Sequence, residues 1–97
     1  MKERHYYVYF LMNKLHTTLY IGITSNLQKR LWQHQEKIAK GFTKKYNITK
    51  LVFNETYDDP ETAIAREKQL KRWSRIKKEA IIKRLNPRLV DLSLAWN

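Results

Sequence analysis

The sequence predicts an α+β fold in which helices pack on an antiparallel sheet. Two observations support this class: the order of the patterned segments, and the short polar connection between the first two of them. Strand-like segments joined by tight turns pair in antiparallel fashion, and an order without regular βα alternation is typical of α+β folds. The predicted order is β-β-α-β-α-α. The 97 residues suffice for one domain, residues 1–97, with a modest core.

The three predicted strands are rich in aromatic and β-branched residues, which favour a pleated, half-buried surface. They cover Tyr6–Leu11, Thr17–Thr24 and Lys50–Tyr57. Residues 12–16 form the loop between the first two strands, so these two are predicted to make a hairpin.

Tyrosines recur at alternate positions of the hairpin. Because successive side chains point to opposite faces of a strand, Tyr7 and Tyr9 share one face of the first strand. In the second strand, Tyr20 and Gly22 share a face in the same way. We therefore expect Tyr9 and Tyr20 to stand side by side, with their hydroxyls converging over the first helix.

The first helix is predicted to begin at Ser25 or Asn26, which are favourable N-cap residues, and to end at Gly41. At about 100° per residue, His34 falls within its apolar stripe and Arg30 lies beside it, one turn away. The two side chains either act on one ligand, or they are a core-edge histidine and an arginine whose aliphatic stem is buried. The stripe itself consists of Leu27, Leu31 and Ile38.

The second helix, Pro60–Trp73, begins with acidic residues and a proline, as is common near helix N-termini. Its inward face is predicted to comprise Ala63, Ile64 and Leu70, with Glu67 between them. A carboxylate on that face needs compensation. A basic side chain or a metal ion would each provide it, and spacing alone leaves both open.

The last third of the chain is predicted to be a helix and an apolar tail. Ser74 caps the helix Arg75–Leu85, and Asn86 and Pro87 end it. The tail, Leu89–Trp96, is expected to drape across the core.

The chain is strongly basic, with 20 Lys and Arg against 9 Asp and Glu and a formal net charge of +11. Between positions 66 and 84 there are nine basic and two acidic residues. This excess favours a polyanionic partner, with nucleic acid first and an anionic membrane surface second, although solubility alone is the simpler alternative.

Cysteine is absent, which excludes disulfides and thiolate metal sites. With no apolar run long enough for a signal peptide or a membrane span, a cytoplasmic location is expected.

These segments together resemble the GIY-YIG nuclease family. Tyr7-Val8-Tyr9 stands where the family has its first triplet, and Tyr20-Ile21-Gly22 matches the second. The helix that follows, residues 24–34, and the segment Ala63–Lys71 are similar to the family's catalytic helix and to its metal-binding segment. The resemblance runs from about residue 6 to residue 86, and it is closest to the small stand-alone bacterial members that carry this domain alone.

The resemblance implies a three-stranded antiparallel sheet flanked by helices and metal-dependent cleavage of DNA phosphodiesters. Glu67 would hold one divalent ion, Mg²⁺ or Mn²⁺, and Arg30 would contact the scissile phosphate. Tyr9 would position or deprotonate the attacking water. Tyr20 and His34 would orient the water, the phosphate or each other.

The chain departs from the family pattern in two places. Tyr7 replaces the glycine of the first triplet, and Ile23 stands where some members have a lysine, a role that Lys44 or Lys45 from the basic loop would take over. Asn86 is a candidate for a late asparagine of the family, although termination of the preceding helix explains it equally well.

The leading hypothesis is thus an endonuclease with little sequence specificity, in DNA repair or processing, acting on branched, damaged or single-stranded DNA. We expect a monomer, with a protein partner as one means of targeting. The alternative is a nucleic-acid-binding module with little or no catalysis. A membrane-surface or protein-interaction domain is a third possibility, which gives no role to Glu67. The expected nucleic-acid-binding residues are Lys44, Lys45, Lys71 and Arg72.

Overall fold

The computed structural model describes residues 4–36 and 45–96 and has the predicted α+β architecture. Its elements follow the order β-β-α-β-α-α, with a short 3₁₀ helix near the C-terminus. The elements are β1 (Tyr6–Met12), β2 (Leu19–Thr24), α1 (Leu27–Gln35), β3 (Lys50–Tyr57), α3 (Pro60–Arg72), α4 (Arg75–Leu85) and η1 (Leu92–Ala95). No helix in this described part is long and apolar enough to cross a lipid bilayer.

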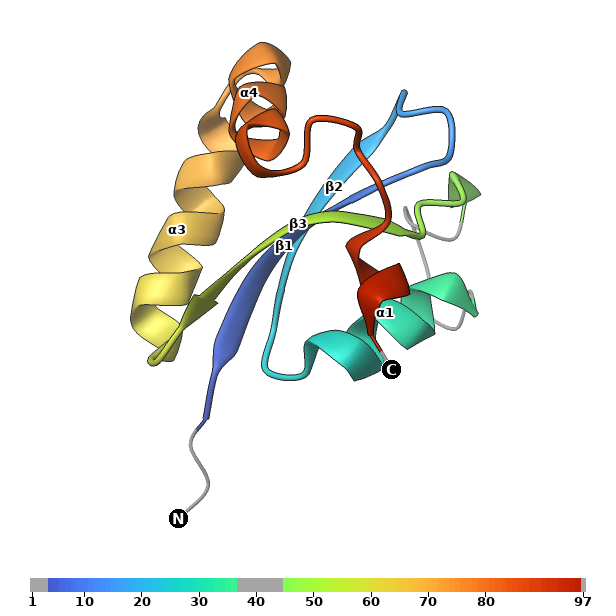
Figure 1. The fold of residues 1–97 in the computed structure, drawn as a ribbon. Helices are drawn as coiled ribbons and strands as arrows, with labels where there is room; N and C mark the ends of the chain where they lie inside the picture. Colours follow the sequence, from blue (N-terminus) through green and yellow to red (C-terminus); the bar gives the residue numbers. More distant parts are fainter. Residues whose placement is uncertain (1–3, 37–44, 97) are drawn as a thin grey trace.

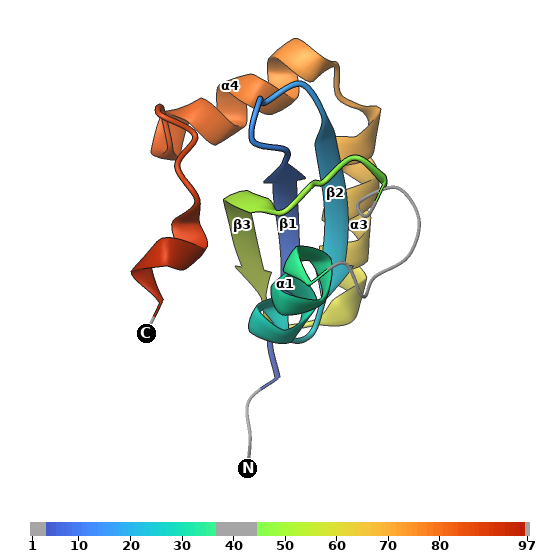
Figure 2. The same cartoon turned by 90° about the vertical axis from the view of Figure 1, so that its right-hand side faces the viewer.

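The sheet is antiparallel with the strand order β2-β1-β3, so β1 is the central strand. Helix α1 covers one face, and α3 covers the other (Figures 1 and 2). Helix α4 lies beyond the end of α3, and the C-terminal tail returns beside β3 (Figure 1). The prediction of a three-stranded antiparallel sheet flanked by helices is confirmed.

Two hydrophobic clusters hold the layers together, one on each face of the sheet. The cluster under α3 consists of Val8, Phe10, Met12, Ile21, Val52, Phe53, Ala63, Leu70, Ile82 and Leu89. The cluster under α1 consists of Tyr9, Leu11, Leu27, Leu31, Ile48 and Leu51. Since β1 contributes to both clusters, its residues from Val8 onward are buried whichever way they point.

Side-chain caps fix where the helices begin. Asn26 accepts a hydrogen bond from the backbone of Lys29, which makes it the N-cap of α1. Asp59 caps α3 and Ser74 caps α4 in the same way. Each cap satisfies a backbone N–H that has no partner within its helix.

Two local predictions are wrong: the residue at which α1 ends, and the place of Ile64 on the inward face of α3. Helix α1 ends at Gln35, where Glu36 forms its C-cap, so the helix stops short of Gly41, and Gly41 and Ile38 lie outside the described residues. Ile64 is 42% exposed and does not belong to the inward face of α3. The buried face is centred on Ala63 and Leu70, which are seven positions or about two turns apart, and Ile64 is rotated by about 100° from Ala63.

The tail docks on the sheet as predicted. Leu89 is buried, and Leu92 and Trp96 pack against the cluster under α1. The first residue of α4 is tied to the loop of the β1–β2 hairpin, because the Arg75 guanidinium donates to the carbonyl oxygens of His16 and Thr17.

Candidate active site

A tyrosine and a histidine meet at the centre of the face covered by α1. Tyr9 comes from the central strand, and its register partner on β2 is Gly22. Its Oη lies 3.1 Å from Nε2 of His34, which α1 directs onto the sheet, and both side chains are 1% exposed. The imidazole tautomer decides which group donates this hydrogen bond. The helical periodicity therefore predicted correctly that His34 faces the sheet.

Tyr20 completes an aromatic cluster with these two residues. Its ring centroid lies 6.3 Å from that of Tyr9 and 5.5 Å from that of His34. Tyr20 pairs with Leu11 in the register, so it is a diagonal neighbour of Tyr9, a distance that aromatic side chains span. The expectation that the two phenols stand side by side is confirmed.

Gly22 provides the space that the Tyr9 phenol occupies. A Cβ atom at this position would collide with Oη of Tyr9 and would lie 2.5 Å from its Cζ and 3.0 Å from Cε2 of Tyr20. The triplet Tyr20-Ile21-Gly22 thus has a steric reason for its glycine. No pattern within β2 indicates this role of Gly22, because the role depends on a side chain from the neighbouring strand.

Arg30 places a positive charge beside the cluster. Its Nη1 donates to Oε1 of Gln33 at 3.1 Å. Burial by itself would lower the pKa of the Arg30 guanidinium, but interactions with the phenols of Tyr9 and Tyr20 raise it. Arg30 is therefore charged at any physiological pH, and an anion that reaches these phenols meets it.

Burial shifts the pKa values of the two central groups in opposite directions. Desolvation, followed by the nearby charge of Arg30, lowers the pKa of His34 to about 4. Desolvation, followed by the proximity of Tyr20, raises the pKa of Tyr9 to about 12, although the hydrogen bond and charge of Arg30 act against that rise. At neutral pH, His34 is consequently a neutral imidazole and Tyr9 a protonated phenol.

Glu67 is directed inward from α3, as the sequence predicted. Its side chain is 15% exposed, and Oε2 lies 3.1 Å from Nζ of Lys71, which is 54% exposed. The charge of Glu67 also contributes, after burial, Tyr20 and Arg30, to the shift in the pKa of Tyr9. The carboxylate is thus electrostatically coupled to the phenol and paired with a lysine.

The donor set fits a hard divalent cation that keeps most of its water. Within the described residues, no three His, Cys, Asp or Glu side chains gather where they could share a metal. Glu67 would be a single carboxylate ligand, and waters and substrate oxygens would supply the rest. Mg²⁺ is commonly bound in this way, and Mn²⁺ accepts similar ligands.

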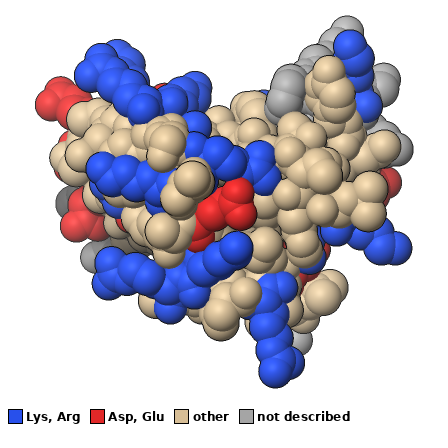
Figure 3. Space-filling model, turned by 90° about the horizontal axis from the view of Figure 1, so that it is seen from above, with Lys and Arg blue, Asp and Glu red and all other residues tan. Residues whose placement is uncertain are grey.

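The predicted nucleic-acid-binding residues that the structure describes lie on two segments, the last turn of α3 and the position just before Tyr46. Lys45 is exposed beside the ring of Tyr46, Arg72 is exposed at the end of α3, and Lys71 pairs with Glu67. Lys44 lies outside the described residues. Lys and Arg side chains also spread over the face seen from above (Figure 3), so basic character on this face extends beyond the predicted residues.

Asn86 has a structural position. It is 5% exposed and forms the C-cap of α4. Its Nδ2 donates to the carbonyl oxygens of Val52 and Val90, and its Oδ1 accepts from the Val90 amide. These bonds tie the tail to β3, the strand on the other side of β1 from β2, and account for Asn86 without a role at the phenols.

Comparisons of the sequence with known proteins indicate the family. The family model for the GIY-YIG catalytic domain matches residues 5–80. A UPF0213 protein of Syntrophus aciditrophicus is 41% identical over 71 residues, which cover 72% of this chain and 80% of the relative. A UPF0213 protein of Natronomonas pharaonis is 34% identical over 77 residues, which cover 79% of this chain and 89% of the relative.

A solved structure shows the same fold. The solution structure of a UPF0213 protein from Bacillus halodurans aligns with a TM-score of 0.58 at 24% identity, over 96% of this chain and 99% of the other. The family match extends across both tyrosine triplets, the Arg30/His34 helix and Glu67. The chain therefore belongs to the GIY-YIG nuclease superfamily and is similar to its small UPF0213 members.

Proposed function

We propose that this protein is a metal-dependent endonuclease that hydrolyses DNA phosphodiester bonds with little sequence specificity. The observation that carries the proposal is the contact between Tyr9 Oη and His34 Nε2 at 3.1 Å, next to the charge of Arg30. We further infer that it acts as a cytoplasmic monomer in DNA repair or processing, with a protein partner as one means of targeting.

Arg30 is assigned to the scissile phosphate. A guanidinium offers paired N–H donors that match two phosphate oxygens, and it stays charged while negative charge develops in the transition state. The net charge of +11 supports a polyanionic substrate, because it draws DNA toward the whole surface.

Tyr9 and His34 are assigned to the attacking water. A phenol with a pKa of about 12 keeps its proton at neutral pH, so Tyr9 cannot act alone as a resting base. With Nε2 of His34 unprotonated, Tyr9 donates to the imidazole and its oxygen accepts from water. Burial lowers the pKa of His34 most, and the charge of Arg30 lowers it further. A phosphate bound to Arg30 offsets that second contribution, which makes the imidazole a better proton acceptor. Tyr20 is assigned to orienting the water or the phosphate.

Glu67 is assigned to Mg²⁺ or Mn²⁺. When bound there, the ion would supply Lewis-acid stabilisation of the phosphate and of the leaving oxygen. Lys71 must release the carboxylate first, and its half-exposed side chain has solvent into which to turn.

The second candidate function is a nucleic-acid-binding module with little catalysis. The ion pair between Glu67 and Lys71 favours it, because a lysine then satisfies the carboxylate in place of a metal. The exposed basic residues serve either function equally.

Nicking of supercoiled plasmid and of branched DNA with Mg²⁺ or Mn²⁺ separates the two functions. We expect cleavage by the wild type, and a loss of roughly 100-fold or more in Glu67→Gln and in Arg30→Ala. Glu67→Gln should still bind DNA. Glu61→Gln is the matched control, since Glu61 lies exposed in the first turn of the same helix, and it should cleave like the wild type. DNA binding without cleavage under either metal would support the binding module.

A further inference from the structure

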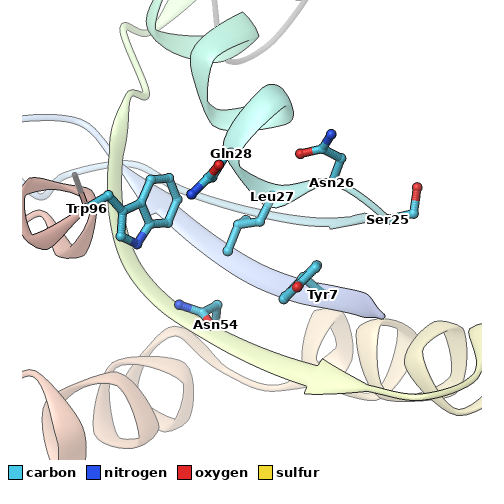
Figure 4. Close-up of a pocket in the computed structure, with 7 residues that line it drawn as sticks. All are labelled: Tyr7, Ser25, Asn26, Leu27, Gln28, Asn54 and Trp96. Atoms are coloured by element: carbon cyan, nitrogen blue, oxygen red, sulfur yellow. The ribbon is translucent and has the colours of Figure 1, made fainter. Parts of the chain in front are cut away.

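A pocket lies beside the phenol cluster, on the same face of the sheet. Its volume is about 470 Å³, within the range of small-molecule sites. The N-terminal turn of α1, strands β1 and β3 and the C-terminal tail together form it (Figure 4). The lining residues are Tyr7, Ser25, Asn26, Leu27, Gln28, Asn54 and Trp96. None of them has a role in the function proposed above.

The pocket adjoins the Tyr9 phenol through two of its walls. Tyr7 is two positions before Tyr9 on β1, so the two side chains share a face about 7 Å apart. Asn54 is the direct register partner of Tyr9 on β3, and such cross-strand neighbours lie about 5 Å apart. Since a stacked DNA strand rises about 3.4 Å per nucleotide, the pocket is within about two nucleotides of the reacting centre.

The chemistry of the walls suits a flat ring with polar edges. Trp96 and Tyr7 lie on either side of Leu27, and the Gln28 amide extends toward the indole (Figure 4). Within residues 4–36 and 45–96, the side-chain amides of Asn54 and Gln28 make no hydrogen bond to protein. Amides offer both donors and acceptors, as nucleobase edges require.

We propose that this pocket binds one unpaired nucleobase of the DNA strand that is cut, stacked on Trp96 or Tyr7 and read at its edge by Asn54 and Gln28. A base held within a duplex cannot enter such a pocket without leaving the stack. The substrate class is therefore DNA with a single-stranded or unstacked nucleotide near the scissile bond, and this part of the inference rests on the proposed nuclease function. Tyr7 stands where the family's first triplet has glycine, so this aromatic wall departs from that triplet.

The pocket is tested by binding in the Glu67→Gln variant without metal, so that cleavage plays no part. Fluorescence anisotropy would be measured with labelled 12-nucleotide single strands in which one abasic site is moved along the sequence, and with the matching duplex. We expect the intact strand to bind more tightly than the duplex. An abasic site at one position should weaken binding roughly 5- to 150-fold, the range for loss of one stacked base.

The variants assign that lost base to the pocket. Trp96→Ala or Tyr7→Ala should weaken binding of the intact strand and remove the penalty of the abasic site, because the two changes delete one contact. Trp96→Phe, which keeps a ring, should restore most of the affinity. Leu94→Ala is the matched control on the same tail, since Leu94 is 81% exposed and outside the pocket, and it should keep the full penalty. Asn54→Ala tests the pocket without touching the tail.

The two proposals fail in distinguishable ways. An abasic penalty that is absent, or that persists unchanged in Trp96→Ala, Tyr7→Ala and Asn54→Ala, overturns the base pocket. The base pocket is also overturned if the wild-type protein with Mg²⁺ cleaves fully paired duplex as fast as single-stranded DNA. That result leaves the proposed nuclease function standing. A penalty that depends on Trp96 in a protein that never cleaves supports the pocket and removes the nuclease.

Discussion

The two faces of the sheet differ in chemistry although the same strand, β1, supplies both. Under α3, Val8, Phe10 and Met12 are fully buried among other hydrocarbon side chains. Under α1, Tyr9 is equally buried, but its hydroxyl contacts His34. The β1 side chains on one face therefore contribute packing alone, and those on the other face combine packing with a group that can hold and move a proton.

This difference shows how a small domain can tolerate a polar centre. Burying a hydroxyl and an imidazole costs free energy even when they pair with each other. The apolar face under α3 offsets that cost, since hydrocarbon burial is the dominant favourable contribution to folding. Stability and chemistry should then separate when the two faces are changed one at a time.

The largest effect on stability is expected from Phe10→Ala. Phe10 is fully buried and packs against Phe53, with ring centroids 5.3 Å apart. Its truncation should lower the free energy of unfolding by about 3–5 kcal/mol, as for other buried aromatic residues. Urea unfolding measures the loss.

Tyr9→Phe, on the other face of the same strand, should lower the free energy of unfolding by about 1–3 kcal/mol and reduce cleavage by roughly 100-fold or more. The comparison fails if Tyr9→Phe cleaves like the wild type.

A pH-dependent loss of stability is expected from His34. Its pKa is about 4 in the folded protein against 6.5 ordinarily, so the unfolded chain binds more protons between these values. The contribution of His34 to the free energy of unfolding should be fully present above about pH 6.5. It should fall as the pH is lowered toward 4, by about 3 kcal/mol over the whole window. Thermal unfolding from pH 7 to pH 5 follows the upper part of this loss.

His34→Gln supplies the control for that slope. The variant should be less stable at pH 7, because it removes a buried ring, but it should change less with pH. His16→Gln corrects for a second histidine with a lowered pKa, which lies in the hairpin loop. An unchanged slope in His34→Gln would show that His34 is not the titrating group.

A smaller effect on stability is expected from filling the space beside Tyr9, on the face of the sheet that α1 covers. Gly22→Ala should lower the free energy of unfolding by about 1–3 kcal/mol, as overpacking does, because the new methyl group collides with the Tyr9 phenol. The displaced phenol should also leave His34, so cleavage should fall even at temperatures where the variant is folded. Ile21→Val is the matched change on the opposite face and should cost about 0.5–1.5 kcal/mol with cleavage retained. Equal activity of the two variants would contradict the steric role of Gly22.

Much of this arrangement follows from local patterns in the sequence. Alternation along β1 and β2 predicted which tyrosines share a face, and helical periodicity predicted that His34 and Glu67 point inward. These are properties of single elements, set by 2.0 and 3.6 residues per repeat. The cap at Ser74 is local in the same sense.

The remainder depends on contacts between distant segments, which no single repeat encodes. The need for Gly22 arises from a side chain on another strand. The role of Asn86 arises from the position of the tail beside β3, and Trp96 lines a pocket because that tail returns to α1. Ile64 satisfied the apolar pattern but is exposed, because the sheet covers a narrower part of α3 than the pattern suggested.

The smallest effect on stability is expected from Lys71→Met. The Lys71 end of its ion pair with Glu67 is 54% exposed. Because solvent screens the pair from that side, its loss should change the free energy of unfolding by less than about 1 kcal/mol. The freed carboxylate should bind divalent cations more readily, and half-maximal cleavage should need roughly two- to fivefold less Mg²⁺. Lys83→Met is the control: it removes an i,i+4 ion pair with Glu79 on α4 and should leave the Mg²⁺ requirement unchanged.

If Lys71 instead serves mainly to bind DNA, Lys71→Met would weaken DNA binding without moving the Mg²⁺ concentration for half-maximal cleavage. A Mg²⁺ titration at saturating DNA distinguishes the two roles, and it thereby tests whether the carboxylate on the apolar side of the sheet belongs to the chemistry of the phenol side.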